Sequence, residues 1–219
     1  MLNFAVQNDY LPQNPFSKIR GIIVSSAETE RNRILSFEEE ARLLEVCTDR
    51  RVHLRPILIC ALDTAMRAGE IFKMKWRDII SNEIQIPQTN TKTEESRIVG
   101  ITPRLRFELQ TLWEVSRKDR EEFVFGISDS VKTSWKTACR LAAVEDFRLH
   151  DCRHTATTRM IASGSPHTEV MKITGHSQLK TFLRYLNITS EAANKVATRL
   201  GDYVEENAAG IDSVSERVN

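Results

Sequence analysis

The chain has 219 residues, of which 41% are hydrophobic and 28% charged, and these values are ordinary for one globular domain. It contains no run of about 18 apolar residues, which excludes a membrane-spanning helix. The net charge of +1 is low for a protein that binds nucleic acid, so composition alone would not propose that partner. The four cysteines form no C-x-x-C pair, so the sequence predicts free cytosolic thiols and neither a zinc site nor a disulfide framework.

The N-terminal part is predicted to contain a helix end, a linker and the start of a second helix. Apolar residues at 2–6 are typical of a helix end, and the turn-rich stretch 8–15 follows them. Residues 18–33 are polar and mixed, which indicates a linker. Ser36 and Glu39 form a capping box, so a helix is expected to begin there. The apolar face of that helix is expected to contain Phe37, Ala41, Leu43 and Leu44.

A core helix is predicted over 53–65, because its middle, Ile57–Leu62, is apolar nearly all round. The small residues Ala68 and Gly69 then predict a break in the chain. A short helix is expected over 70–76.

A small antiparallel ribbon is predicted next. Residues 84–86 alternate as a half-buried strand does, a polar turn over 89–96 carries Lys92, and a return strand is expected over 97–101. The rest of the chain favours helices, which are expected over 103–117, 130–144, 151–162, 168–173 (closed by Gly175) and 190–203. Together these elements predict a mainly α fold with a small antiparallel β-sheet, in one domain.

The stretch Leu149–Asn187 gathers histidines, cationic side chains and one tyrosine. Such a set suits an oxyanion that must be held, protonated and attacked. The arginine fork binds phosphate oxygens bidentately, and histidine moves protons near neutral pH. A tyrosine becomes a usable nucleophile when cations stabilise its phenolate or when a base takes its proton. The stretch therefore predicts phosphoryl transfer on a nucleic acid, with Tyr185 as the nucleophile.

Motifs in this stretch resemble the active-site sequence of the tyrosine recombinases, the phage integrase family. They are His150-x-x-Arg153, Gly175-His176 and Tyr185, nine residues after His176. Upstream, Thr64–Glu70 resembles the first-arginine motif of the family, and Thr91-Lys92-Thr93 resembles its β-hairpin lysine. Each residue alone is more often a solvated or structural side chain, but all six positions occur in the family's order between about residues 35 and 200.

The resemblance implies a role for each of the six residues. Tyr185 would attack the scissile phosphate, form a 3′-phosphotyrosyl link and release a 5′-hydroxyl. Lys92 would be the general acid for the 5′-oxygen, and His150 would assist proton transfer at the tyrosine. The charge on the non-bridging oxygens would be stabilised by Arg67, Arg153 and His176.

The resemblance extends to supporting positions and to cofactors. Glu70, three residues after Arg67, is expected to orient an active-site cation, and Asp151 to act similarly from outside the reacting groups. The family position before Gly175 usually holds leucine, and Thr174 in its place is expected to matter little. Rejoining by a 5′-hydroxyl would retain the bond energy, so no cofactor, neither ATP nor a metal ion, is expected.

The same resemblance predicts the organisation of the chain. Residues 1–34 would be the end of an N-terminal core-binding domain with an interdomain linker. Residues 35–189 would form the catalytic domain, and 190–219 a C-terminal helix with a disordered acidic tail. The chain would then be a catalytic-domain fragment.

The implied function is site-specific DNA recombination by a phage or prophage integrase. The expected partners are double-stranded DNA at an attachment or core site, further copies of the chain in a tetramer on DNA, and accessory DNA-bending proteins. The chain alone would be a monomer in the bacterial cytoplasm, associated with the nucleoid and not with a membrane. Two alternatives remain, a type IB topoisomerase-like relaxation of DNA and a non-catalytic DNA-binding remnant of a defective prophage.

Overall fold

The computed structural model describes residues 2–15, 33–90, 96–127, 130–176, 182, 194 and 197–205. The chain divides into two compact units, Met1–Asn32 and Arg33–Asn219. In the first unit, α1 (Leu2–Gln7) is the helix expected near the N-terminus, and the Asn8 side chain closes it by donating to the carbonyl of Phe4 at 2.9 Å. The predicted linker over 18–33 lies almost wholly outside the described residues.

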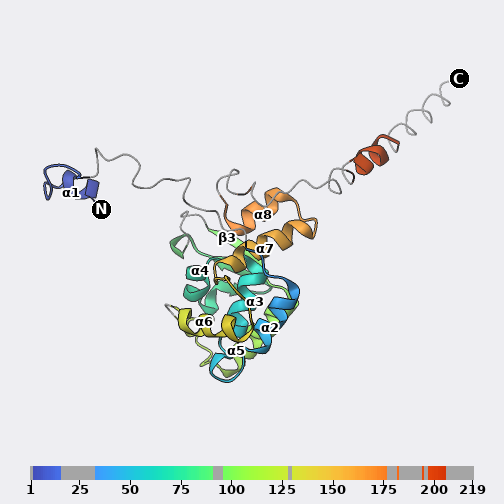
Figure 1. The fold of residues 1–219 in the computed structure, drawn as a ribbon, viewed down its shortest axis with the longest axis horizontal. Coiled ribbons are helices and arrows are strands. Elements are labelled where there is room, and N and C mark those ends of the chain that lie inside the picture. Colours follow the sequence, from blue (N-terminus) through green and yellow to red (C-terminus); the bar gives the residue numbers. More distant parts are fainter. Residues whose placement is uncertain are drawn as a thin grey trace. The chain divides into compact units, whose positions relative to one another are not determined.

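The second unit is mainly helical and contains one small sheet (Figure 1). Its α-helices are α2 (Phe37–Glu45), α3 (Leu54–Thr64), α4 (Ala68–Lys73), α5 (Pro103–Val115), α6 (Lys132–Leu141), α7 (Asp151–Ala162) and α8 (His167–Thr174). Short 3₁₀ turns occur at η2 (Asp49–Arg51), η3 (Trp76–Asp78) and η4 (Gln88–Asn90). Residues 197–205 are also helical, within the helix predicted over 190–203. No helix in the described part of the chain combines the length and the apolar character needed to cross a bilayer.

Helix α3 forms the centre of the hydrophobic core. Its apolar residues are buried on every side, and it packs against α4, α5 and α7 (Figure 1). A helix that is apolar all round is stable only in such a position, because no face of it is suited to water. The sequence prediction of a central helix is therefore confirmed.

The chain breaks after α3 earlier than predicted. Ala65 closes the helix in the left-handed conformation, with φ of 54°. Helix α4 already begins at Ala68, so the predicted break at Ala68 and Gly69 is wrong, and Gly69 lies inside α4. The turn is held by the buried Glu70 carboxylate, which accepts a hydrogen bond from the Arg67 backbone N–H at 2.8 Å and so caps α4.

The sheet has three antiparallel strands where the sequence predicted two. β2 (Glu83–Ile86) lies between β3 (Arg97–Gly100) and the two-residue β1 (Ile79–Ile80), which is too short to show an alternating pattern. Ile84 of β2 is opposite Val99 of β3, and both are buried. This register turns one face of the hairpin toward the core.

The capping box at Ser36 and Glu39 is confirmed, since each side chain bonds the backbone N–H of the other residue. Phe37 and Ala41 were predicted to lie on the buried face of α2, and this is wrong for both, because Phe37 is 72% exposed and Ala41 is also exposed. The Arg159 guanidinium lies 4.2 Å above the Phe37 ring, so the ring packs against a cation at the surface.

Helix α6 is shorter than the predicted 130–144, because Ala143 adopts a left-handed conformation with φ of 49°.

Candidate active site

Arg67 lies in the short turn between α3 and α4. Its Nη1 donates to Oε1 of Glu70 at 3.0 Å, and its Nη2 donates to the carbonyl of Gly175 at 3.3 Å. Gly175 closes α8, more than a hundred residues further along the chain. The Arg67 side chain thus connects the start of α4 with the residue that precedes His176.

Arg153 belongs to α7 and is only 4% exposed. Its Nη1 donates at 2.7 Å to the carbonyl of Ala65, which the left-handed end of α3 leaves available. Its Nη2 lies 3.5 Å from Nε2 of His176. Two arginines, one from the turn before α4 and one from α7, therefore lie beside the same short segment, Gly175-His176.

His176 follows the left-handed cap of α8. Gly175 has φ of 69°, a conformation that glycine adopts at no steric cost, and the backbone N–H of His176 donates to the carbonyl of Met171 at 3.0 Å. The imidazole Nδ1 lies 2.7 Å from Oγ1 of Thr174, and the ring centre lies 5.7 Å from that of the buried Phe182. These contacts fix the direction in which the ring points.

His150 precedes the first residue of α7 and is exposed. Although the residue keeps an exposed face, partial loss of hydration at the ring and then the charge of Arg153 lower its pKa from the ordinary 6.5, and a smaller effect of Arg67 has the same sign. Asp151 opposes this shift without cancelling it. His150 is therefore neutral at pH 7 and able to accept a proton. His154, which contacts the His150 ring edge-on at 5.6 Å between centres, adds a second imidazole beside it.

Asp151 is buried at the first residue of α7. Its Oδ2 accepts a hydrogen bond from the backbone N–H of Arg148 at 2.8 Å. A carboxylate in the first turn also interacts favourably with the helix dipole. This hydrogen bond stabilises the start of the helix that carries Arg153.

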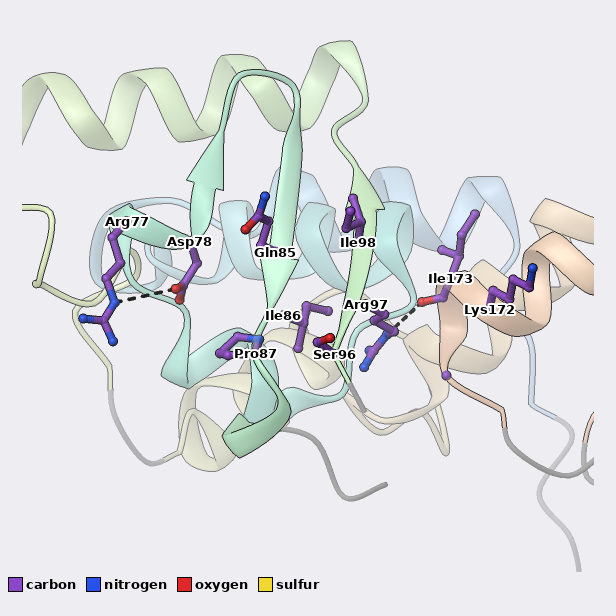
Figure 2. A pocket seen from close by; sticks show the side chains of 11 residues that line it. Arg77, Asp78, Gln85, Ile86, Pro87, Ser96, Arg97, Ile98, Lys172 and Ile173 are labelled. Atoms are coloured by element: carbon purple, nitrogen blue, oxygen red, sulfur yellow. Dashed lines mark hydrogen bonds and ion pairs between the residues drawn. The ribbon is translucent and has the colours of Figure 1, made fainter. Parts of the chain in front are cut away.

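Arg97 is a residue of this site that the sequence reasoning missed. It begins β3, its side chain is 8% exposed, and its guanidinium forms two bonds with the Glu70 carboxylate, Nη1–Oε1 at 3.0 Å and Nη2–Oε2 at 2.5 Å. Its Nε donates to the carbonyl of Ile173 in α8 at 2.8 Å (Figure 2). The available signal was the strand alternation, which places Arg97 on the same inward face as Val99.

Glu70 is 3% exposed and is shared by Arg67 and Arg97. Burial is the largest single influence on its pKa and raises it, but the bonds from Arg97 and then from Arg67 outweigh burial, so the pKa lies below the ordinary 4.5. The carboxylate is charged at neutral pH. One buried anion thus holds two cations in fixed positions beside the end of α8.

A groove of about 730 Å³ lies between the sheet and α8, where its lining includes Arg97, Lys172 and Gly175 (Figure 2). Among the described residues, no group of three or more histidine, cysteine or acidic side chains is arranged to hold a metal ion. The four cysteines are free and buried. The site combines arginine and histidine side chains with the carboxylates of Glu70 and Asp151.

A row of cations on α6 was also missed. Lys132, Lys136 and Arg140 recur every four residues, so they lie on one helix face, and all three are exposed. In the described part of the chain, none of their charged groups forms an ion pair. We call these three residues the α6 basic row; together with Arg148 they line a second groove that reaches Leu149, next to His150.

Four of the six residues predicted to be catalytic are described, and these lie at the junction of α3, α4, α7 and α8. Lys92 and Tyr185 lie outside the described residues, as does the final acidic stretch from 206 onward.

The family model described as "Phage integrase family" matches residues 33–192, which is most of the chain.

The chain belongs to the phage integrase family.

Known proteins of this family resemble the chain in sequence and in fold. It is 32% identical over 179 residues to a shufflon-specific DNA recombinase of Escherichia coli, an alignment that covers 80% of the chain and 44% of the relative. The catalytic domain of bacteriophage HP1 integrase matches with a TM-score of 0.57 and 25% identity, over 69% of the chain and 85% of that domain. The Tn1549 transposon integrase, solved in complex with circular intermediate DNA, matches with a TM-score of 0.63 and 17% identity, over 89% of the chain and 74% of the integrase.

These matches confirm the predicted fold, a mainly α tyrosine recombinase catalytic domain with a small antiparallel sheet. The chain spans less than half the length of the Escherichia coli relative.

Proposed function

We propose that this phage integrase family chain carries out site-specific DNA recombination, by cutting and rejoining strands through a phosphotyrosyl intermediate. The observation that carries the proposal is the convergence of three donors. Arg153 Nη2 lies 3.5 Å from His176 Nε2, and Arg67 reaches the carbonyl of Gly175 beside the same histidine. Cations and an imidazole at one point suit the two non-bridging oxygens of a phosphodiester, on which charge develops during attack.

The proposed reaction is a transesterification at the scissile phosphate. The Tyr185 hydroxyl oxygen bonds to phosphorus, the phosphorus–O5′ bond breaks, and a 3′-phosphotyrosyl link and a 5′-hydroxyl result. His150 receives the phenol proton, and Lys92 supplies the proton that O5′ takes. The reverse attack, by the 5′-hydroxyl of a partner strand, rejoins the DNA. Because each step exchanges one phosphodiester for another, the scheme consumes no ATP.

Double-stranded DNA is the proposed substrate, and the α6 basic row is its proposed contact surface beside the site. Exposed lysine and arginine side chains without ion-pair partners are suited to the phosphate backbone, since each contact releases condensed counterions. In this proposal residues 35–189 act as the catalytic domain, and the chain assembles as a tetramer on DNA.

The proposal is tested with a nicked duplex that traps the covalent intermediate. The duplex carries the direct repeats that flank the gene, because such repeats mark the attachment site of an integrated element. We expect a protein–DNA adduct that resists denaturation, and we expect Tyr185→Phe to abolish it while duplex binding persists. An adduct that persists with Tyr185→Phe, or wild-type chain that binds the duplex and leaves it intact, would contradict the proposal.

Relaxation of supercoiled plasmid without preference for a site would instead favour the topoisomerase-like alternative. A chain that binds the duplex specifically and never cuts it would favour the non-catalytic remnant. Both outcomes are measured on the same preparation, by gel electrophoresis of plasmid and by filter binding of the duplex.

A further inference from the structure

Thr174 is the last residue of α8, two positions before His176, and it is fully buried. The sequence alone gave it no role, because the corresponding position in the resembling family usually holds leucine. In the structure its hydroxyl oxygen makes three close polar contacts. They lead to the carbonyl of Val170 at 2.7 Å, the carbonyl of Met171 at 3.3 Å and Nδ1 of His176 at 2.7 Å.

The direction of each hydrogen bond follows from counting protons. A threonine hydroxyl has one proton to donate, and a carbonyl oxygen can only accept. The short contact with Val170 therefore uses the hydroxyl proton of Thr174, in the back-bond that threonine forms to the carbonyl four residues earlier. The contact of 2.7 Å with His176 remains, and it is a hydrogen bond only if Nδ1 carries a proton and donates it.

We propose that Thr174 is a positioning residue that holds the proton of His176 on Nδ1, so that Nε2 is the nitrogen that gains and loses a proton beside Arg153. In the neutral ring, Nε2 then has the lone pair, and in the charged ring it carries the proton that a phosphate oxygen can accept. The partner of one ring nitrogen sets the state of the other, as it does for histidines that ligate metals.

The tautomer of His176 is a property of the folded chain, whether or not the chain cuts DNA. The effect of that tautomer on strand cleavage rests on the proposed function. Each part has its own measurement, so a failure of one is distinguishable from a failure of the other.

The tautomer is measured by NMR on the full chain labelled with ¹⁵N-histidine, at a pH where the ring is neutral. We expect the His176 signals of the Nδ1–H form in the wild type, and their assignment comes from their loss in His176→Asn. Thr174→Val keeps the shape of the side chain and removes the hydroxyl, and we expect it to shift His176 to the Nε2–H form. Thr174→Ser keeps the hydroxyl and should keep the Nδ1–H form.

Thr157→Val is the matched control for loss of a buried hydroxyl. The Thr157 hydroxyl donates to the carbonyl of Arg153 at 2.8 Å, in the same back-bond pattern, and Thr157 is equally buried. Its substitution should leave the His176 tautomer unchanged. An Nε2–H form in the wild type, or an equal change in both valine variants, would overturn the tautomer assignment.

The cleavage part is measured as the rate of adduct formation on the nicked duplex. We expect Thr174→Val to slow adduct formation by about 10-fold or more and Thr174→Ser to restore it, as is typical of residues that orient a catalytic group. An unchanged rate in Thr174→Val, together with the expected tautomer shift, would overturn the positioning role. If the wild type shows the Nδ1–H form and forms no adduct, the proposed function fails and the tautomer assignment stands.

Discussion

Arg97 and Glu70 form a buried, bidentate ion pair that joins β3 to α4, with Nη1–Oε1 at 3.0 Å and Nη2–Oε2 at 2.5 Å. The same carboxylate accepts from Arg67, and the same guanidinium donates to the carbonyl of Ile173. The positions of Arg67 and of the end of α8 are therefore coupled through one pair of charges. This pair links three segments that are distant in sequence, and it makes the sheet part of the candidate active site.

Replacing Arg97 by alanine should destabilise the fold. Among the described residues it leaves the buried Glu70 carboxylate with Arg67 alone as a charged partner, and we expect the free energy of unfolding to fall by about 3 kcal/mol, as is typical when one partner of a buried pair is removed. Arg97→Lys should recover little of this loss, because an ammonium group cannot reproduce two parallel bonds to a carboxylate. Urea unfolding followed by circular dichroism measures both variants.

Arg77→Ala is the control for this prediction. Arg77 forms an ion pair with Glu121 in which both side chains are more than half exposed, so its loss should cost less than about 1 kcal/mol. If Arg77→Ala and Arg97→Ala lower the free energy of unfolding equally, the buried Arg97–Glu70 pair contributes no more to stability than an exposed ion pair does.

Glu70 should also make stability depend on pH in the acid range. Its pKa is lowered in the folded chain from the ordinary 4.5, because the bonds from Arg97 and Arg67 outweigh the effect of burial. The folded state then binds fewer protons than the unfolded state, so this contribution is complete above 4.5 and is lost as the pH falls through the lower folded value.

Glu70→Gln tests that dependence, because glutamine does not titrate. At pH 7 the variant should be less stable than the wild type, and the difference should shrink as the pH falls below 4.5. The measurement is a series of urea unfolding curves for both proteins between neutral and acid pH. A difference that stays constant across the series would show that Glu70 does not contribute through its charge.

Gly175→Ala should weaken the connection between α8 and His176. The residue has φ of 69°, and an added Cβ would lie 3.3 Å from Nη1 of Arg97. The left-handed conformation alone costs a non-glycine residue about 1–2 kcal/mol, and displacement of Arg97 adds to that cost. Thermal and urea unfolding should both show the loss.

Gly126→Ala separates the two contributions. Gly126 has nearly the same φ, 62°, and no atom within 4 Å of an added Cβ. It should therefore show the backbone cost without the contact with Arg97. Equal losses for Gly175→Ala and Gly126→Ala would mean that Arg97 moves aside freely and does not constrain Gly175.

The elements predicted best from the sequence are those set by contacts between residues close together in the chain. Helix α7 begins at Asp151 and ends at Ala162 as predicted, and the capping box at Ser36 acts within four residues. The two errors that matter for the site have distant causes. Nothing local marks Ala65 for a left-handed conformation, since its carbonyl is bound by Arg153, 88 residues away. The strand alternation placed Arg97 on the inward face, but its role was missed because its partner Glu70 lies 27 residues earlier.

Charge reversal on the α6 basic row should weaken binding of duplex DNA in a salt-dependent way. Lys132→Glu with Lys136→Glu removes two exposed cations from one helix face and adds two anions. If each lysine contacts one phosphate, the slope of log K against log salt concentration should fall in magnitude by about 2. Fluorescence anisotropy with a labelled duplex across a range of salt concentrations measures the slope.

The matched control reverses two other exposed cations, Arg50 and Arg117, with the same change in net charge. If binding reflects only the total charge, both double variants should lose the same affinity and the same salt slope. If DNA lies along α6, the control should keep most of its slope, because residues that do not contact phosphate release no counterions. Equal slopes for the two double variants would therefore remove α6 from the proposed DNA surface, whatever the change in affinity.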